Sequence, residues 1–311
     1  MRAEFAQAMV ALFEKRTDLV FVTADLGYLA LEGVARTYGE RFVNAGVAEQ
    51  NAVSFAAGLA REGHQPWVYS AAVFTALRPF EQIRNDVCLH QLPVKLVGNG
   101  GGYTYGIMGA THHALEDIGA LRALPNMRLY LPLVAEDVAQ VVGAMAEDPL
   151  PNYLRLGVAA ELPGELPEFA PWRRLKTGRS CIVIGTGPVI QGLYELGMPE
   201  LFDELEIWSV GTFPLEDLPA TLAESIAEKR RVVTIEEHYG PCGLGEALSH
   251  LFLMSGNVPE AMDCLFAAGY PSGRYGSQRF HRQESGLAGP ALASRLSRFV
   301  AERGTARRDG R

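Results

Sequence analysis

The sequence lacks the cysteine patterns that hold structural metals. Its four cysteines are widely scattered and no two form a CxxC pair; they are Cys88, Cys181, Cys242 and Cys264. Free, buried thiols are the ordinary interpretation, and no structural zinc site is expected. Because such thiols suit a reducing compartment, we expect a cytoplasmic protein.

Long apolar runs and an excess of positive charge are missing as well. No apolar run approaches the roughly 20 residues that a membrane-spanning helix needs. The 28 basic residues are outnumbered by 36 acidic ones and form no basic stripe, so nucleic acid is not an expected partner. Glu4 and Glu14 interrupt the N-terminal apolar pattern, which indicates an amphipathic helix and not a signal peptide.

Neither of the common nucleotide-binding fingerprints is present. The glycine-rich segment 98–102 follows a strand-like run, but it does not lead straight into a helix as GxGxxG does. No P-loop with GK[ST] occurs, and the segment 185–188 contains a proline that favours a tight turn. Glycines at the carboxyl end of a strand still let a ligand approach the backbone, so segment 98–102 predicts a binding loop.

Strand-like and helical segments alternate along the chain. The strand-like runs are 19–23, 42–43, 65–69, 93–97, 128–131, 153–156, 180–185, 206–210 and 231–235. Their alternation with helices predicts an α/β protein of two consecutive α/β domains with mainly parallel sheets. We expect domains over 1–160 and 178–300, a proline-rich linker without helix or strand over 161–177, and a disordered tail over 301–311.

Glu49 is the first candidate for chemistry. It lies where an extended apolar run turns into a helix of small residues, expected from Val47 to about Glu62. Most acids in the first turn of a helix simply complement the helix dipole. Because Glu49 has small and apolar neighbours on both sides, a buried acid that faces a ring nitrogen is the alternative interpretation.

Two adjacent histidines, His112 and His113, follow the glycine-rich segment. A metal would need further ligands, and Glu116 and Asp117 are expected to begin a helix instead, so no metal site is predicted in this chain. A histidine that donates to a substrate oxygen, or exchanges a proton with it, is the preferred interpretation.

Several segments resemble, in order and spacing, the second half of transketolase, above all the split two-gene transketolases and the deoxyxylulose-phosphate synthases. They read FVTADLG, RFVNAGVAEQN, FTALRPFEQIRNDV, GATHHALEDIGALRALPNM and TIEEHYGPCGLGEAL, and the resemblance spans about residues 2 to 300. It implies a pyrimidine-binding domain followed by the transketolase C-terminal domain. The chain would then be the C-terminal subunit of a thiamine-diphosphate-dependent transferase.

The resemblance also implies roles for single residues. Glu49 would contact N1′ of the thiamine diphosphate aminopyrimidine and favour the tautomer whose 4′-nitrogen takes the C2 proton. Phe74 would stack on the pyrimidine, Asp25 would lie near the thiazolium ring, and Val47 would lie at the bend of the cofactor. His112 would face the substrate, so Glu49 and His112 are the expected catalytic residues.

The GDG…N motif with which these enzymes hold the diphosphate and its Mg²⁺ does not occur in the sequence. The resemblance therefore implies an N-terminal partner subunit that carries this motif and holds the Mg²⁺, with the cofactor bridging the two subunits. An α2β2 heterotetramer is expected from the family and from the usual two-fold pairing of such assemblies.

The expected substrate pocket departs from the family pattern where sugar phosphates are recognised. Gly100 stands at the phosphate-side histidine position, Met108 replaces an acid that recognises a sugar hydroxyl, and Val158 occupies a phosphate-binding arginine position. These changes remove charge-assisted donors. We expect a more apolar or bulkier pocket and transfer of a two-carbon ketol or acyl unit to a specialised aldehyde or ketone acceptor, not to ordinary pentose phosphates. The residues expected to line the pocket are Tyr28, Tyr103, Tyr105, Ile107, Met108 and His113.

Two other functions stay open from the sequence. The β-type subunit of a 2-oxo acid dehydrogenase shares the domain pair, although GATHHALEDIGALRALPNM favours transketolase. A non-catalytic scaffold subunit is the second alternative. The retention of Glu49, Phe74 and His112 argues against a scaffold, since a scaffold needs no acid that faces a cofactor.

Overall fold

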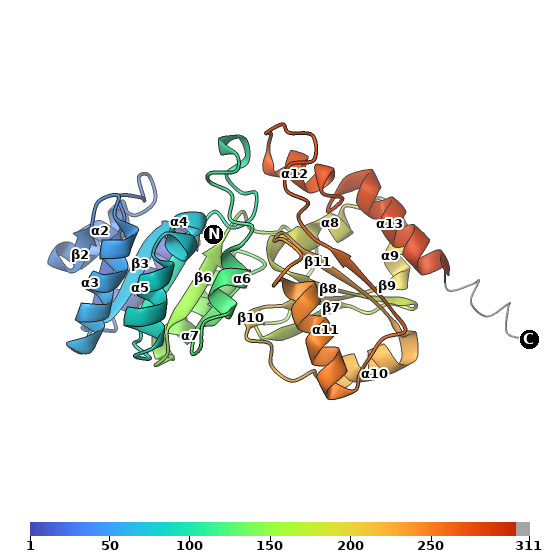
Figure 1. Ribbon diagram of the computed structural model, residues 1–311, viewed down its shortest axis with the longest axis horizontal. Helices are drawn as coiled ribbons and strands as arrows, with labels where there is room; N and C mark the ends of the chain where they lie inside the picture. The colour runs from blue at the N-terminus through green and yellow to red at the C-terminus, as the bar shows by residue number, and fades with distance from the viewer. Residues whose placement is uncertain (303–311) are drawn as a thin grey trace, which may run out of the picture.

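The computed structural model describes residues 1–302 and consists of two α/β units that lie side by side (Figure 1). The first unit runs from α1 to β6 and the second from β7 to α13. The expected α/β class, with two consecutive and mainly parallel sheets, is confirmed. None of the helices in residues 1–302 has the length and apolar content to cross a lipid bilayer.

The first sheet has seven strands in the order β10-β5-β6-β4-β3-β1-β2. Six of them come from the first unit and are parallel to one another: β1 (Leu19–Thr23), β2 (Phe42–Asn44), β3 (Gln65–Ala71), β4 (Lys95–Asn99), β5 (Arg128–Tyr130) and β6 (Asn152–Leu156). Their parallel order brings the carboxyl ends of β1, β3 and β4 to one edge of the sheet, where ligands of α/β proteins bind.

Helices cover both faces of this sheet. They are α1 (Arg2–Phe13), α2 (Glu32–Tyr38), α3 (Glu49–Arg61), α4 (Ala72–Leu77), α5 (Phe80–Gln82), α6 (Asp117–Arg122) and α7 (Asp137–Glu147), with short 3-10 turns η1 (Gly39–Arg41) and η3 (Gly106–Met108) and the π-helical turn η2 (Ile83–Cys88). Alternate strand residues face opposite layers. Phe21 and Trp67 pack with Phe5 of α1 on one face, whereas Val22 and Val68 pack with α3 on the other.

The second sheet has the order β12-β11-β8-β9-β7. Its strands are β7 (Trp172–Lys176), β8 (Cys181–Thr186), β9 (Leu205–Val210), β11 (Arg231–Glu236) and β12 (Ala261–Leu265), and only β7 is antiparallel to its neighbour. Its helices are η4 (Gly187–Ile190), α8 (Gln191–Tyr194), α9 (Pro199–Glu204), α10 (Ala220–Lys229), α11 (Leu244–Ser255), α12 (Gln278–Glu284) and α13 (Gly289–Ala301).

The expected linker 161–177 is wrong in one part, because Trp172–Lys176 forms the edge strand β7. Buried Arg173 in this strand pairs with Asp137 of the first unit at 2.7 Å. The run WRRLK conceals the strand in the sequence, since three of its five residues are basic. In the expected tail 301–311, Ala301 still belongs to α13, and residues 303–311 lie outside the described part of the chain.

The two units share secondary structure across their boundary. Strand β10 (Thr212–Phe213) follows β9 in the second unit, yet it pairs antiparallel with β5 and so extends the first sheet. Phe213 is buried in the hydrophobic core that also contains residues of α3 and β6. The second unit is therefore built into the first one and not joined to it by a tether.

Candidate active site

Loops at the carboxyl edge of the first sheet bring the predicted residues together. Asp25 follows β1, Glu49 follows β2, Phe74 lies on α4 directly after β3, and His112 lies in the long segment after β4. These loops rise on the same side of the sheet, the segment after β4 forming the tall green loop in Figure 1. The topology thus fixes which residues can meet one ligand.

Glu49 is buried, with only 2% of its surface exposed, although it begins helix α3. Gly46, with φ of 73°, turns the chain sharply between β2 and this helix. The Ser70 hydroxyl donates to Oε1 of Glu49 at 3.2 Å, and Nη1 of Arg78 donates to Oε2 at 2.5 Å. A helix-capping acid would face solvent, so this burial and pairing support the alternative interpretation of Glu49 as a buried acid.

The Phe74 ring contacts both Arg78 and His112. The guanidinium carbon of Arg78 lies 4.3 Å from the centroid of the Phe74 ring, and the His112 ring meets the Phe74 ring edge-on at 5.4 Å. Tyr105 follows at 5.9 Å from His112, and its hydroxyl accepts a hydrogen bond from Asn99 at 3.1 Å. Glu49, Phe74 and His112 therefore belong to one chain of contacts.

Arg78 was missed by the sequence analysis, although it lies within the segment FTALRPFEQIRNDV that carries the resemblance. Its spacing of four residues from Phe74 is the signal that could have shown it, because residues at i and i+4 share one face of a helix. With Arg78 on one face of Phe74, a ligand ring that stacks on that face has to displace the guanidinium.

Asp25 and Val47 lie at the rim of this edge. Nδ2 of Asn44 donates to Oδ1 of Asp25 at 2.9 Å, while Oδ1 of Asn44 accepts the backbone N–H groups of Asp25 and Gly46. Asn44 thus fixes the two loops that carry Asp25 and Val47. The Val47 side chain is 73% exposed, as is expected of a residue that meets a ligand or a second subunit.

The residues expected to line the substrate pocket separate into two groups. Tyr28, Ile107 and Met108 are exposed, and Tyr105 lies beside His112. Tyr103 and His113 are buried instead, and their side chains point into the second unit. The expectation that Tyr103 and His113 line the pocket is not supported. Neighbouring residues of an irregular loop can face opposite sides, and the sequence does not show which side each residue faces.

The glycines of segment 98–102 are needed for a different reason from the expected one. A side chain at Gly101 would collide with Arg155, and one at Gly102, which has φ of 63°, would collide with Glu237. These glycines make room for the protein's own side chains at the junction of the two units, and not for a ligand.

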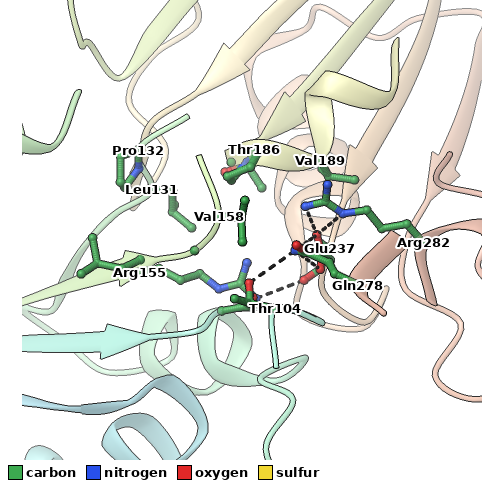
Figure 2. Close-up of a pocket in the computed structure, with 15 residues that line it drawn as sticks. Thr104, Leu131, Pro132, Arg155, Val158, Thr186, Val189, Glu237, Gln278 and Arg282 are labelled. Carbon is green, nitrogen blue, oxygen red and sulfur yellow. Dashed lines mark hydrogen bonds and ion pairs between the residues drawn. The ribbon is translucent and has the colours of Figure 1, made fainter. Parts of the chain in front are cut away.

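The junction behind this segment is polar but fully paired (Figure 2). Arg155 forms a bidentate pair with Asp117, and Nε of Arg282 donates to Oε2 of Glu237 at 2.6 Å. Gln278 donates to the same carboxylate at 3.0 Å. Each of these charges has its partner within its own unit, and Nη2 of Arg155 donates across to the carbonyl oxygen of Glu237 at 3.1 Å, so this polar cluster is a structural junction between the two units.

Arg2 is a second residue that the sequence analysis missed. Its Nη2 donates to the carbonyl oxygen of Tyr28 at 3.0 Å, so the first turn of α1 reaches the substrate side of the sheet edge. Burial raises the pKa of Tyr105, whereas its hydrogen bond with Asn99 and then the charge of Arg2 lower it. Among residues 1–302, Arg2 pairs with no carboxylate; it is an exposed cation beside the predicted pocket.

Comparisons with known proteins point to one family. Residues 1–159 match the family model described as transketolase, pyrimidine binding domain. One subunit of the apulose-4-phosphate transketolase of Phocaeicola vulgatus is 33% identical over 253 residues, which are 78% of this chain and 80% of that protein. The 1-deoxy-D-xylulose-5-phosphate synthase of Carboxydothermus hydrogenoformans is 30% identical over 274 residues, 86% of this chain and 44% of that protein. A solved structure described as split gene transketolase, inactive beta4 tetramer, has a TM-score of 0.81 at 28% identity and covers 96% of this chain and 97% of its own.

Proposed function

This chain belongs to the transketolase family, and we propose that it is the C-terminal subunit of a split, thiamine-diphosphate-dependent transketolase. The observation that carries the proposal is the buried Glu49 carboxylate in contact with Arg78, beside Phe74 and His112. The partner is a subunit with the diphosphate site and the Mg²⁺, in an α2β2 assembly. Two relatives are each named as one subunit of an apulose-4-phosphate transketolase, which supports the existence of such a partner.

The residues at the sheet edge fit the aminopyrimidine of this cofactor. Glu49 is an acceptor that Ser70 holds at Oε1, while Arg78 occupies Oε2 and the Phe74 face, which are the positions that the pyrimidine would take over. A charge buried without such partners would be too costly to keep. When bound, the cofactor supplies the carbanion chemistry that stabilises a two-carbon unit during transfer.

The chain's own residues have distinct tasks in this proposal. Glu49 would accept a hydrogen bond from the ring nitrogen at Oε2, in place of Arg78, and fix the orientation of the pyrimidine, while Ser70 holds Oε1. His112 lies beside Phe74 and is positioned to exchange a proton with a substrate oxygen. Its Nδ1 is engaged by the Thr111 hydroxyl at 2.9 Å, which leaves Nε2 for the substrate.

The proposed substrate is a phosphorylated sugar other than the ordinary pentose phosphates. The positions of Gly100, Met108 and Val158 carry no charge, and Arg2 is an exposed cation in contact with Tyr28. We assign the phosphate to Arg2, because a guanidinium without a carboxylate partner can bind a phosphate with charge-assisted hydrogen bonds. The apulose-4-phosphate named in two relatives is a candidate of this class.

The test is turnover by the complex of this chain with its companion subunit. Glu49→Ala is expected to lower kcat about 10²–10⁴-fold, the range typical of a lost general acid–base group, while the complex stays intact by size-exclusion chromatography. Glu62→Ala, at the exposed end of the same helix, is the matched control and should keep full activity.

Two outcomes would contradict the proposal. Unchanged turnover in Glu49→Ala would favour a scaffold subunit. Turnover of a 2-oxo acid with an artificial electron acceptor, but not of sugar phosphates, would favour the dehydrogenase alternative.

A further inference from the structure

The segment after β4 is held by the second unit along most of its length. We call residues 103–113 the substrate loop. Its backbone N–H at Tyr103 donates to Glu237 at 2.6 Å, and the Thr104 hydroxyl accepts from Gln278 at 3.3 Å. A side chain at Gly106 would approach the carbonyl oxygen of Gly276 at 3.1 Å, and one at Gly109 would lie 3.0 Å from the Tyr275 ring.

The loop residues that face the first sheet edge alternate with these anchors. Tyr105 and His112 point toward Asn99 and Phe74, and Ile107 and Met108 are exposed. The anchored residues thus belong to the contact with the second unit, and the presented residues belong to the candidate active site. Because the two sets alternate along one loop, the residues anchored to the second unit set the position of those that face the candidate active site.

Five rings form the centre of the contact, and we call them the His281 cluster: Tyr103, His113, Tyr270, Tyr275 and His281. The Tyr103 ring stacks on His281 with centroids 5.0 Å apart, and the His113 ring meets His281 edge-on at 4.9 Å. Tyr270 stacks on His113 at 5.7 Å and meets Tyr275 edge-on at 5.3 Å. The first two rings come from the substrate loop and the other three from the second unit.

Hydrogen bonds fix the tautomers of both histidines. Nε2 of His281 accepts the backbone N–H of Gly276 at 3.1 Å, so this nitrogen carries no proton. Nε2 of His113 donates to the carbonyl oxygen of Gly106 at 2.9 Å, and Nδ1 is hydrogen-bonded to the Tyr270 hydroxyl at 2.8 Å. Burial lowers the pKa of both histidines, which favours the neutral rings, and each ring holds a turn of the backbone in place.

A contact that served only for packing would not need so many directed bonds. Buried polar groups stabilise one arrangement strongly when all of them are satisfied, because any other arrangement leaves some of them unpaired. In this cluster the Tyr103 hydroxyl donates to the carbonyl oxygen of Gly269 at 2.9 Å and accepts the backbone N–H of the same glycine at 3.0 Å. The cluster therefore specifies the conformation of the loop as well as its attachment.

We propose that the second unit acts as a positioning device for the proposed transfer reaction, with the His281 cluster holding the substrate loop so that His112 and Met108 face the cofactor side. His281 is the central positioning residue; it touches no substrate. The inference rests on the proposed function for its kinetic consequence, but the loop conformation itself can be measured on this chain alone.

The first test is hydrogen exchange of the backbone amides of residues 103–113 in the full chain. His281→Ala removes the stack on Tyr103 and the acceptor for Gly276, so exchange in the loop is expected to rise about tenfold or more, the effect of losing one net hydrogen bond or more. His281→Gln keeps a neutral acceptor and should recover most of the protection. His250→Ala, an exposed histidine on α11 of the same unit, is the matched control.

The second test is kinetic and uses the complex with the companion subunit. His281→Ala is expected to lower kcat/KM for the acceptor by about 10–100-fold, as misplaced groups do, without a change in the affinity for thiamine diphosphate. The affinity should hold because Glu49 and Phe74 belong to the elements after β2 and β3. Recovery by His281→Gln would support positioning.

Three outcomes would overturn the inference. The first is unchanged loop exchange in His281→Ala, and the second is an equal rise of exchange in β8 and β9, which would show a general loss of stability. The third is a parallel loss of cofactor affinity. If the wild-type complex turned over no sugar phosphate, the proposed function would fail, while the exchange experiment would still decide whether the cluster holds the loop.

Discussion

The carboxyl edges of the two sheets have opposite properties, although both sheets are mainly parallel and lie in one chain. At the first edge, Asp25, Tyr28, Val47 and Met108 are exposed around one buried acid, Glu49. At the second edge, Glu236, Glu237 and His238 are all buried where β11 ends. The same position in the same type of sheet is thus open in one unit, where we propose a ligand site, and filled by the protein's own contacts in the other.

Hydrogen bonds show what the second edge does. Glu236 accepts the backbone N–H groups of Leu244 and Gly245 at the start of α11, and burial raises its pKa to about 7. His238 accepts the N–H of Gly119 in α6, and Glu237 accepts the N–H of Tyr103. Polar residues at a sheet edge are therefore not evidence of a site until their partners are known.

The largest expected effect comes from breaking the buried ion pair that holds Arg155 in place, since Nη2 of Arg155 also donates across to the carbonyl oxygen of Glu237 in the second unit at 3.1 Å. Asp117→Ala leaves the buried Arg155 without its carboxylate and the Tyr153 hydroxyl without its acceptor. Loss of one partner from a buried pair should lower the free energy of unfolding by about 3–5 kcal/mol. Urea unfolding followed by circular dichroism measures this change.

Asp263→Ala is the control for that experiment, because its pair with Arg295 lies on the surface and should contribute no more than about 1 kcal/mol. Equal losses in the two variants would show that the buried pair of Asp117 with Arg155 contributes no more to stability than a surface pair.

The next largest effect concerns Arg2, the exposed cation at the carboxyl edge of the first sheet. Arg2→Ala should raise KM for a phosphorylated substrate about tenfold or more, since a hydrogen bond to a charged group contributes roughly 1.5–3 kcal/mol. KM for the unphosphorylated analogue should not change. Lys15→Ala, which removes an exposed cation just after the C-terminal end of α1, should leave KM for both substrates unchanged. Steady-state kinetics of the complex provide the test, and an equal rise in KM for both substrates would remove Arg2 from phosphate recognition.

Arg78→Ala should have the opposite effect and strengthen the binding of a ligand at the first edge. Arg78 covers the Phe74 face and occupies Glu49, and each of these half-exposed contacts contributes up to about 1 kcal/mol. Their removal should tighten thiamine diphosphate binding several-fold, measured by calorimetric titration of the complex. Arg84→Ala, an exposed arginine of the following π-helical turn, should have no effect; weaker binding in Arg78→Ala would show that Arg78 holds the cofactor and does not cover its site.

The smallest effect is a dependence of the substrate loop on pH. Burial lowers the pKa of both His113 and His281, and nearby Glu237, with Glu284 for His281, offsets part of this shift. The unfolded state then binds more protons than the folded one, so the stabilisation is present above about pH 6.5 and is lost as the pH falls through the folded-state pKa. Loop exchange, corrected for its intrinsic rate, should rise a few-fold between pH 7.5 and 5.5, and less in His281→Gln. A profile without slope would contradict neutral histidines in the cluster.

The sequence predicts the elements that local patterns determine. Apolar runs gave β1, β3 and β8, and the small residues after Glu49 predicted a helix there. The segments RFVNAGVAEQN and GATHHALEDIGALRALPNM identified Glu49 and His112 as candidates, and the structure brings both to Phe74.

What the sequence could not show depends on contacts between distant segments. His112 and His113 are adjacent, yet one faces the sheet edge and the other the second unit. The glycines at 101 and 102 make room for Arg155 and Glu237, which are far away in sequence. Arg2 is also hidden, since nothing local shows that the first turn of α1 meets Tyr28.

Calorimetric titration of thiamine diphosphate with Mg²⁺ tests the central claim most directly, namely that this chain supplies one half of a cofactor site. It should be done with the chain alone, with its complex with the companion subunit, and with the same complex carrying Glu49→Ala. The account predicts tight binding to the wild-type complex, at least tenfold weaker binding to the Glu49→Ala complex because a charge-assisted hydrogen bond is lost, and none to the chain alone. Equal affinity of the wild-type and Glu49→Ala complexes, or no binding to either, would contradict it.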